Sequence, residues 1–234
     1  MKAILIHSGS EKEMFPINKM KPKCLLTIGP NNKTIIQDQL DYLVYFGIKK
    51  VLVYVEQFPM ESVTALMALS DKYKKVSLSF IHDNGIFGSG GAILNAIDTE
   101  FLDKDEDFIV LENNYLFYEN LGKLVDKHKK LITAVVKPVK MASGVFIRLG
   151  KFGMVKKVER AEDSSGYLNM GQYIINGGIY EYIKSTHTPC SLPLDIINAV
   201  KTRTQVTVSH KNQFDCSSFD KYFEYFCGLC SELT

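Results

Sequence analysis

Short apolar runs and amphipathic segments alternate along the first part of the chain. The runs that read as buried strands cover residues 2–6, 50–55, 76–81, 108–111 and 132–136. Between them, apolar residues recur at helical spacing over residues 34–46, 59–73, 88–97 and 121–130. Strands and helices that alternate with short connections predict right-handed crossovers. They also predict a mostly parallel, Rossmann-like α/β sheet with helices on both faces.

After about residue 140 the pattern changes to strands joined by Gly-containing turns. Antiparallel strands are expected over residues 144–149, 155–159 and 172–180, followed by a helix over 193–200. A short strand over residues 205–209 and a final helix over 218–230 complete the chain. Since no change of composition marks a linker, we predict one domain, with an appended antiparallel region that begins near residue 141.

Two helices carry local details that the structure can check. Gly47 is expected to end the helix over residues 34–46, because glycine adopts the left-handed conformation that closes many helices. In the helix over 59–73, the residues expected to face the core are Val63, Leu66, Met67 and Leu69.

Composition and charge narrow the classes of function. The chain has 234 residues, 46% hydrophobic and 23% charged, with a net charge of +2, so no strong field indicates a nucleic acid or a membrane as partner. The basic cluster Lys127-His128-Lys129-Lys130 is interpreted as the solvated end of a helix rather than as a nucleic-acid patch.

Cysteine content and apolar run lengths favour a cytoplasmic protein. Five cysteines, an odd number in a long chain, argue against a disulfide scaffold. The lone C-x-x-C pair, Cys227 and Cys230, is read as two thiols on a terminal helix, with a metal or redox role as the alternative. The first residues are too short for a signal sequence, and no run reaches the length of a transmembrane helix.

Arginine is rare, and this limits how the chain can hold phosphate. The three arginines are Arg148, Arg160 and Arg203, so none lies in the first 147 residues. Arginine offers phosphate a planar fork, whereas lysine offers only a point charge. A phosphate held by the first half of the chain therefore depends on lysine and on backbone N–H groups.

The first 29 residues carry the most specific pattern. A strand is followed by a loop that contains Gly9 and Pro16, and Pro22-Lys23 comes six residues after Pro16. This layout resembles the opening of the sugar-1-phosphate nucleotidyltransferases, which have a strand, a loop of the type G-x-G-T-R-x-x-P, and then P-K. Glu11, Lys12 and Glu13 replace the second glycine, the threonine and the arginine of that loop.

The resemblance implies a nucleotide phosphate site in this loop. Ser8, Gly9, Ser10 and Lys12 would bind the triphosphate, and the catalytic residue would be Lys23, which in the family lies across the nucleotide and sugar phosphates. Glu11 and Glu13 oppose this role, because a carboxylate repels a phosphate. At a separation of about 4 Å and an effective dielectric constant near 20, each such contact costs about 4 kcal/mol before screening by salt. The alternatives are a solvated loop that binds no phosphate and, for Lys23, a surface lysine after a turn.

A glycine-rich segment over residues 87–94 resembles the family's L-G-T-A-G-A-L-L segment. The resemblance implies that Gly88 and Ser89 lie against the nucleotide base, with Asn84 close to the base edge. A glycine-rich helix start is also found in turns that are simply close-packed.

Two further segments resemble the family's metal ligands. Asn114, or Asn113 if the register shifts by one, stands where the family has the aspartate of G-D-x-L/I-F, and Asp215 stands in a D-x-x-x-x-x-x-Y pattern. The resemblance implies Mg²⁺ as cofactor, with one of the two family carboxylates replaced by an amide. Glu112 is expected to face the opposite side of its strand.

The antiparallel part resembles the family's sugar side. Lys157, Glu159 and Arg160 lie in a V-x-x-V-E-R segment, from which Glu159 would hold sugar hydroxyls and a basic neighbour the sugar phosphate. Asn176 and Gly177 lie in a segment similar to the family's N-A-G-I-Y strand, in which the asparagine reaches the sugar. The implied fold is the glycosyltransferase-A-like nucleotidyltransferase fold.

Two functions follow from the resemblance. The first is an enzyme that forms an NDP-sugar and pyrophosphate from an NTP and a sugar 1-phosphate, with altered phosphate contacts. The second is a catalytically impaired member of the fold that binds a sugar phosphate, a nucleotide sugar or a protein partner in a regulatory role. The sequence leaves the base, the sugar and the oligomeric state open, a homo-oligomer included.

Overall fold

The computed structural model describes residues 1–7, 14–17, 21–28, 31–55, 60–83, 87–116, 119–186, 188–211 and 214–231. The predictions for Ser8, Gly9, Ser10, Lys12 and Asn84 lie outside these residues, as do Glu11 and Glu13. Within the described residues, no helix is long and apolar enough to span a bilayer.

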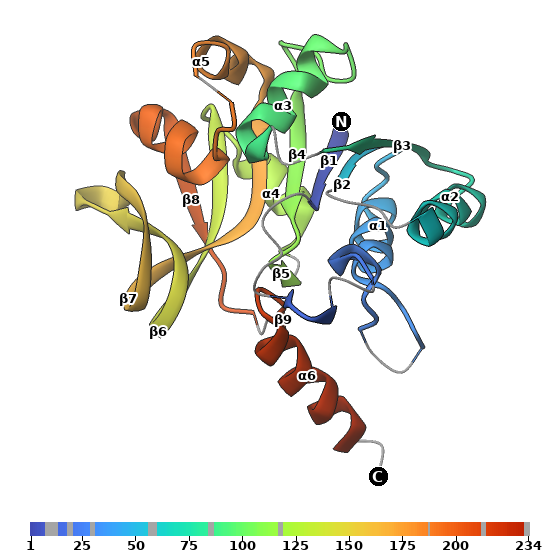
Figure 1. The fold of residues 1–234 in the computed structure, drawn as a ribbon. Coiled ribbons are helices and arrows are strands. Elements are labelled where there is room, and N and C mark those ends of the chain that lie inside the picture. Colours follow the sequence, from blue (N-terminus) through green and yellow to red (C-terminus); the bar gives the residue numbers. More distant parts are fainter. Residues whose placement is uncertain are drawn as a thin grey trace.

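The main sheet has the order β3-β2-β1-β4-β7-β6-β8 (Figure 1). Its strands are β1 (Lys2–His7), β2 (Lys50–Val55), β3 (Ser77–His82), β4 (Asp107–Glu112), β6 (Ile132–Leu149), β7 (Val155–Asn176) and β8 (Thr204–Val208). Strand β7 runs antiparallel to both of its neighbours, and the other pairs are parallel. The predicted α/β sheet, mostly parallel with an antiparallel part, is confirmed.

Helices cover both faces of this sheet and bury two hydrophobic cores. The helices are α1 (Ile35–Tyr45), α2 (Met60–Lys72), α3 (Gly88–Asp98), α4 (Leu121–Lys127), α5 (Tyr180–Ile183) and α6 (Phe219–Ser231). Helices α1, α2 and α4 pack with Leu5 and Val53 on one face, whereas α3 and α5 pack with Ile4 and Leu52 on the other. Successive residues of a strand point to opposite faces of the sheet, and helices cover both faces. Almost every residue of β1 and β2 is therefore buried, so the two strands are continuous apolar runs.

Helix α1 shows how local sequence sets an element. Thr34 caps its N-terminus, with the Thr34 hydroxyl accepting from the Gln37 N–H and the Gln37 side chain accepting from the Thr34 N–H. Gly47 follows the helix at φ +77°, in the left-handed region that ends helices. Both boundaries agree with the prediction.

The antiparallel region differs from the prediction in strand length. The strands expected over residues 132–136 and 144–149 are one strand, β6, and those expected over 155–159 and 172–180 are one strand, β7, which ends at Asn176. The two strands pair along a hairpin with several register shifts, and Gly144 and Gly166 take positive φ angles within it. These bulges and glycines bend the strands without ending them, whereas the sequence pattern reads the bends as turns.

Two smaller predictions are wrong. Met67 is 65% exposed, while Leu66 and Leu69 are buried, because Met67 lies about 100° around the helix from Leu66 and faces solvent. The helix expected over residues 121–130 ends at Lys127, and the chain turns at His128 into β6.

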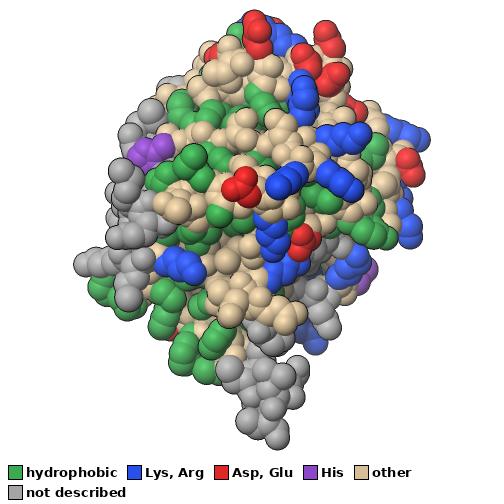
Figure 2. All heavy atoms as spheres, turned by 90° about the vertical axis from the view of Figure 1, so that its right-hand side faces the viewer, with side chains coloured by type: hydrophobic (Ala, Val, Ile, Leu, Met, Phe, Trp, Pro, Cys, Tyr) green, Lys and Arg blue, Asp and Glu red, His purple; other side chains and the backbone are tan. Residues whose placement is uncertain are grey.

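On the face that Figure 2 shows, Lys and Arg side chains are spread among acidic and apolar ones, which fits the small net charge.

Among the described residues, four single-turn 3₁₀ helices and one π-helix connect these elements, and a second, two-stranded sheet pairs β5 with β9. The short helices are η3 (Lys23–Leu25), η4 (Lys151–Gly153), η5 (Gly177–Ile179), η6 (Leu192–Ile197) and η7 (Lys201–Arg203), of which η4 contains a kink at Phe152 and η6 is the π-helix. Strands β5 (Tyr115–Leu116) and β9 (Phe214–Asp215) are antiparallel. This small sheet matters for function because it joins the end of β4 to the start of α6.

Candidate functional site

Lys23 lies buried at the carboxyl edge of the main sheet. It begins η3 after Pro22, and the other two residues of this turn, Cys24 and Leu25, pack into the core and fix its position. The Lys23 side chain is only 3% exposed, and its Nζ donates to Asn114 Oδ1 at 2.9 Å. The fold therefore brings together two residues that the sequence singled out separately.

Asp215 joins the same neighbourhood through the small sheet. Tyr115 pairs with Asp215 between β5 and β9, and the Cys216 N–H donates to the Asn114 carbonyl at 3.0 Å. The Asp215 carboxylate accepts from Lys221 Nζ at 2.6 Å and from the Ser217 N–H at 2.9 Å. The two residues predicted to bind Mg²⁺ are thus adjacent, but the Asn114 side chain already accepts a hydrogen bond from Lys23, and the Asp215 side chain accepts one from Lys221.

The charge of Lys23 acts on its buried neighbours. Burial, and then the Lys23 charge, lower the pKa of His7 to about 3, so the imidazole at the end of β1 is neutral at physiological pH. Burial raises the pKa of the Cys216 thiol to about 11, and the Lys23 charge opposes that rise. Since neither group carries charge at neutral pH, the positive charge of Lys23 is not neutralised by them.

The strand register splits the three residues predicted from β7. Glu159 Oε1 accepts from Arg148 Nε at 2.9 Å, and Glu159 Oε2 accepts from Lys157 Nζ at 2.5 Å. Arg160, the next residue, lies on the opposite face of the strand. Burial raises the pKa of Tyr115 well above its usual range, the Asp215 charge adds to this rise, and the Arg160 charge opposes it. The charge of Arg160 therefore reaches Tyr115, whereas Lys157 and Glu159 form an ion-pair group with Arg148.

The structure does not bring Asn176 and Gly177 to this edge. Asn176 Nδ2 donates to Asp107 Oδ1 at 2.9 Å, and the Gly177 N–H donates to the Glu106 carbonyl at 2.9 Å. Because β7 is antiparallel to β4, the end of β7 lies at the amino end of β4, across the sheet from Lys23. Their assignment to the same site as Lys23 is corrected on this ground.

A polar cluster that the sequence reasoning missed lies at the carboxyl edge instead. Asn169 Nδ2 donates to the Tyr173 hydroxyl at 2.6 Å, and that hydroxyl donates weakly to Glu112 Oε2 at 3.4 Å. Gly171 has φ +64°, and a Cβ there would lie 2.8 Å from Glu112 Cβ, so glycine lets β7 approach β4 closely. The signal was present: the spacing N-x-G-x-Y occurs at residues 169–173 as well as at 176–180.

The glycines at the start of α3 serve close packing. Gly88 has φ +65°, and a Cβ there would lie 2.5 Å from the Cys190 carbonyl oxygen. The Gly90 N–H donates to that same carbonyl at 2.9 Å, and the Ser89 hydroxyl accepts from the Leu192 N–H at 2.8 Å. The space that Gly88 was expected to leave for a base is thus filled by residue 190, while Ser89 also bonds the Glu112 carboxyl.

Gly177 has a structural role at its own edge, and this gives a prediction about stability. A Cβ on Gly177 would overlap the backbone of Asp103 and Lys104, which cannot move as a flexible side chain can. We expect Gly177→Ala to lower the free energy of unfolding by about 1–3 kcal/mol, measured by urea titration. Gly153→Ala is the comparison, because nothing lies within 4 Å of the site of its Cβ and only its φ of +72° causes strain. A smaller loss for Gly177→Ala than for Gly153→Ala would contradict the packing.

Comparison with known proteins adds sequence relatives at low identity. The chain is 28% identical over 187 residues to a bifunctional sugar-1-phosphate nucleotidylyltransferase/acetyltransferase of Sulfurisphaera tokodaii, an alignment that covers 78% of this chain and 43% of the relative. It is 27% identical over 193 residues to a mannose-1-phosphate guanyltransferase of Yarrowia lipolytica, covering 78% of this chain and 51% of the relative. The chain thus spans about half the length of the curated relatives it matches.

Solved structures share the fold, and a family model matches nearly the whole chain. The structure of HddC from Yersinia pseudotuberculosis superposes with a TM-score of 0.79 at 17% identity, covering 100% of this chain and 99% of that one. A UDP-glucose pyrophosphorylase in complex with UDP-glucose superposes with a TM-score of 0.74 at 18% identity, covering 99% of this chain and 98% of that one. The model of the nucleotidyl transferase family matches residues 2–230, and the chain therefore belongs to the nucleotidyl transferase family.

Proposed function

We propose that this chain transfers a nucleotidyl group from a nucleoside triphosphate to a sugar 1-phosphate. The observation that carries the proposal is the buried Lys23 ammonium, held against Asn114 and close to Asp215 at the carboxyl edge of the sheet. Ligands of open α/β sheets bind at this edge. The curated relatives named above, a sugar-1-phosphate nucleotidylyltransferase and a mannose-1-phosphate guanyltransferase, support the general reaction.

The proposed reaction asks mainly for electrostatic stabilisation. A phosphate oxygen of the sugar 1-phosphate forms a bond to the α-phosphorus. The bond from that phosphorus to the bridging oxygen breaks, and pyrophosphate leaves with the electron pair. Negative charge gathers around the α-phosphate, so a positioned cation lowers the barrier. Because the Lys23 side chain is withdrawn from water, its charge is screened less than that of an exposed lysine.

Magnesium fits this site only together with substrate. Among the described residues, no three His, Cys, Asp or Glu side chains come together as a metal site. Asp215 and the Asn114 amide oxygen would supply two oxygen ligands, and Mg²⁺ usually takes one or two carboxylates together with phosphate oxygens and water. When bound, the ion would neutralise phosphate charge. Asp215 would first have to release Lys221.

Proposed contacts to the sugar come from β7. Arg160 is the arginine of β7 whose charge acts on Tyr115, the residue of β5 that pairs with Asp215, and we assign its guanidinium to the sugar phosphate. Asn169, whose Oδ1 is buried without a hydrogen-bond partner, replaces Asn176 as the proposed contact to a sugar hydroxyl. Lys157 and Glu159 remain proposed contacts to the sugar phosphate and the sugar hydroxyls. They are weaker proposals than Arg160 and Asn169, because the Glu159 carboxylate already accepts hydrogen bonds from Arg148 and Lys157.

One observation favours the second candidate function, a binding protein without turnover. The proposed metal position has an amide, Asn114, which is hydrogen-bonded to Lys23, whereas a carboxylate there would bind Mg²⁺ more strongly. The charge of the second proposed ligand, Asp215, is already neutralised by Lys221. In this alternative, a sugar phosphate or nucleotide sugar binds, and no pyrophosphate is released.

The test is a calorimetric titration with CTP, GTP, UTP and dTTP, each with and without Mg²⁺, followed by a pyrophosphate-release assay with sugar 1-phosphates. One triphosphate that binds only with Mg²⁺, followed by pyrophosphate release, would support transfer. A response to a sugar phosphate or a nucleotide sugar without any response to triphosphates would support the binding protein.

Asn114→Asp tests the metal ligand directly. A carboxylate binds Mg²⁺ more strongly than an amide oxygen, so we expect the Mg²⁺ concentration for half-maximal triphosphate binding to fall by about tenfold. Asn113→Asp is the matched variant, since the two asparagines are neighbours and either could stand at the metal position. If Asn113→Asp lowers the Mg²⁺ requirement and Asn114→Asp does not, the metal position is one residue earlier than proposed.

A further inference from the structure

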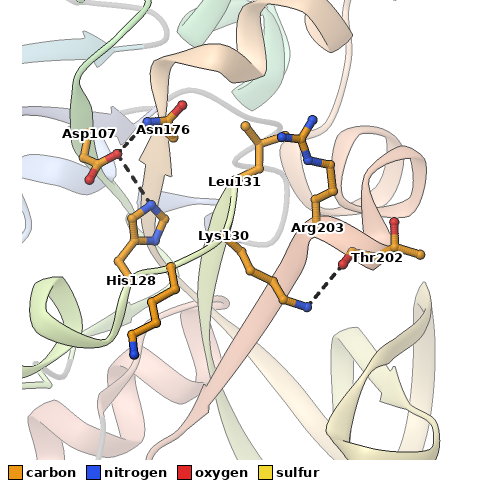
Figure 3. Close-up of a pocket in the computed structure, with 8 residues that line it drawn as sticks. Asp107, His128, Lys130, Leu131, Asn176, Thr202 and Arg203 are labelled. Carbon is orange, nitrogen blue, oxygen red and sulfur yellow. Dashed lines mark hydrogen bonds and ion pairs between the residues drawn. The ribbon is translucent and has the colours of Figure 1, made fainter.

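A cavity lies at the amino edge of the sheet, where no step of the proposed reaction takes place. Its volume is about 440 Å³, within the range of small-molecule sites. It forms between the segment that links α4 to β6, the start of β4, the end of β7 and η7 (Figure 3). The polar side chains that line it include Asp107, His128, Lys129, Lys130, Asn176 and Arg203.

The cavity has more positive than negative charge. Lys129, Lys130 and Arg203 line it against a single carboxylate, Asp107. Lys130 Nζ donates to the Thr202 carbonyl at 3.2 Å, and the Arg203 Nη1 donates to the Tyr182 hydroxyl at 2.6 Å. These contacts hold both cations at the rim through neutral partners, so neither charge is cancelled, and the guanidinium keeps further N–H donors for a ligand.

His128 supplies a buried polar atom without a partner. Its side chain is 4% exposed, and its Nδ1 lies 2.6 Å from the Thr133 hydroxyl. Its Nε2 lies 3.6 Å from Asp107 Oδ1, which is too long for a hydrogen bond, and finds no other partner among the described residues. A buried ring nitrogen without a hydrogen-bond partner is costly, and a ligand atom in the cavity would remove that cost.

Asp107 and Asn176 add hydroxyl recognition beside the cations. The Asp107 carboxylate accepts a hydrogen bond from Asn176 Nδ2 at 2.9 Å on Oδ1, and His128 Nε2 lies 3.6 Å from the same oxygen. A carboxylate accepts about four hydrogen bonds, so Asp107 keeps acceptor capacity for ligand hydroxyl groups. Cations and a hydroxyl acceptor in one cavity fit a molecule that carries both a phosphate and several hydroxyls.

We propose that this cavity binds a phosphorylated sugar, with its phosphate at Arg203, Lys129 and Lys130 and its hydroxyls at Asp107. The site is separate from the one at Lys23. Asp107 begins β4 and Glu112 ends it, which places the two ends roughly 17 Å apart at the usual rise per residue. Both sites can therefore be filled at once, and a ligand at the amino edge lies too far from Lys23 to react there.

Calorimetry of the full chain with ribose 5-phosphate and with inorganic phosphate tests the proposal. We expect ribose 5-phosphate to bind more tightly, because inorganic phosphate lacks the sugar hydroxyls. Arg203→Gln and Lys129→Gln should each weaken ribose 5-phosphate binding by about tenfold. Since Arg203 also holds Tyr182, Lys129→Gln keeps the test valid if Arg203→Gln is unstable.

Two control variants separate this site from its surroundings. Lys201→Gln removes the same charge from the exposed surface of η7 without lining the cavity and should change the affinity by less than about twofold. Lys23→Gln should also leave the affinity unchanged. The imidazole signals of His128 should shift on binding, whereas those of the exposed His210 should not. Absence of ribose 5-phosphate binding at millimolar concentrations, or its loss in Lys23→Gln but not in Lys129→Gln, would overturn the proposal.

Discussion

Replacing Lys23 with methionine is expected to lower kcat/KM for nucleotidyl transfer by about 100- to 1,000-fold, the usual cost of losing one preorganised electrostatic contact. Methionine keeps an unbranched apolar chain in the buried channel and removes only the charge and the hydrogen bond to Asn114. Pyrophosphate release measures the effect. If turnover is too slow to detect, the same variant should weaken triphosphate binding in calorimetry.

Two controls make this result specific. Lys49→Met removes a lysine from the exposed surface before β2 and should leave kcat/KM unchanged. Lys23→Met should also raise the pKa of His7, because the Lys23 charge is the second cause, after burial, of its depression to about 3. An NMR titration of His7 reports this rise whether or not the protein turns over. Unchanged kcat/KM together with a raised His7 pKa would show that Lys23 is where we place it but is not catalytic.

The second large effect is expected from Glu112→Gln, which should stabilise the protein at neutral and alkaline pH. Burial raises the pKa of the Glu112 carboxyl from 4.5 to about 7, and hydrogen bonds from Ser89 and Tyr173 only partly oppose the rise. Between these two values the unfolded chain has released the proton that the native state still holds. The stability of the native protein therefore falls as the pH rises from about 4.5 to about 7, and the loss stays constant above that range.

Glutamine keeps the size of the side chain and removes this titration. At about pH 8 we expect the free energy of unfolding of Glu112→Gln to exceed that of the unmodified chain by up to about 3 kcal/mol, and the difference should vanish at about pH 4. Urea titrations across this range measure both curves. Glu162→Gln, on the exposed part of β7, should change stability by less than about 0.5 kcal/mol at every pH. A Glu112→Gln protein that is less stable than the unmodified chain at about pH 8 would contradict a buried, costly carboxylate.

The Glu112 carboxyl also illustrates what a sequence motif does not reveal. The pattern around residues 109–118 predicted the strand and the asparagines that follow it, and the structure confirms the strand as β4. The environment of Glu112 comes from Ser89 on α3 and from Gly171 and Tyr173 on β7, which approach it across the sheet. A pKa depends on the groups around the side chain in space, so the spacing of neighbours along the chain does not determine it.

The sequence by itself determined the features that depend on neighbours along the chain. The apolar runs predicted β1, β2 and β4, and helical spacing over residues 34–46 followed by Gly47 predicted α1 and its end. The spacing of Pro22 and Lys23 singled out the lysine that the fold buries. Helix caps, strand alternation and short motifs are local interactions, so the sequence carries them directly.

Only the tertiary structure decided which of two equal motifs lies at the candidate site. The spacing N-x-G-x-Y occurs at residues 169–173 and again at 176–180, and nothing in the sequence ranks one above the other. The antiparallel register of β7 on β4 places Gln172 opposite Leu111 and Asn176 opposite Asp107, so the first motif lies near the carboxyl edge and the second at the amino edge. The same register completes the cavity around His128. Strand pairing joins residues far apart in the chain, and its register is set by the packing of whole strands, which a local pattern does not contain.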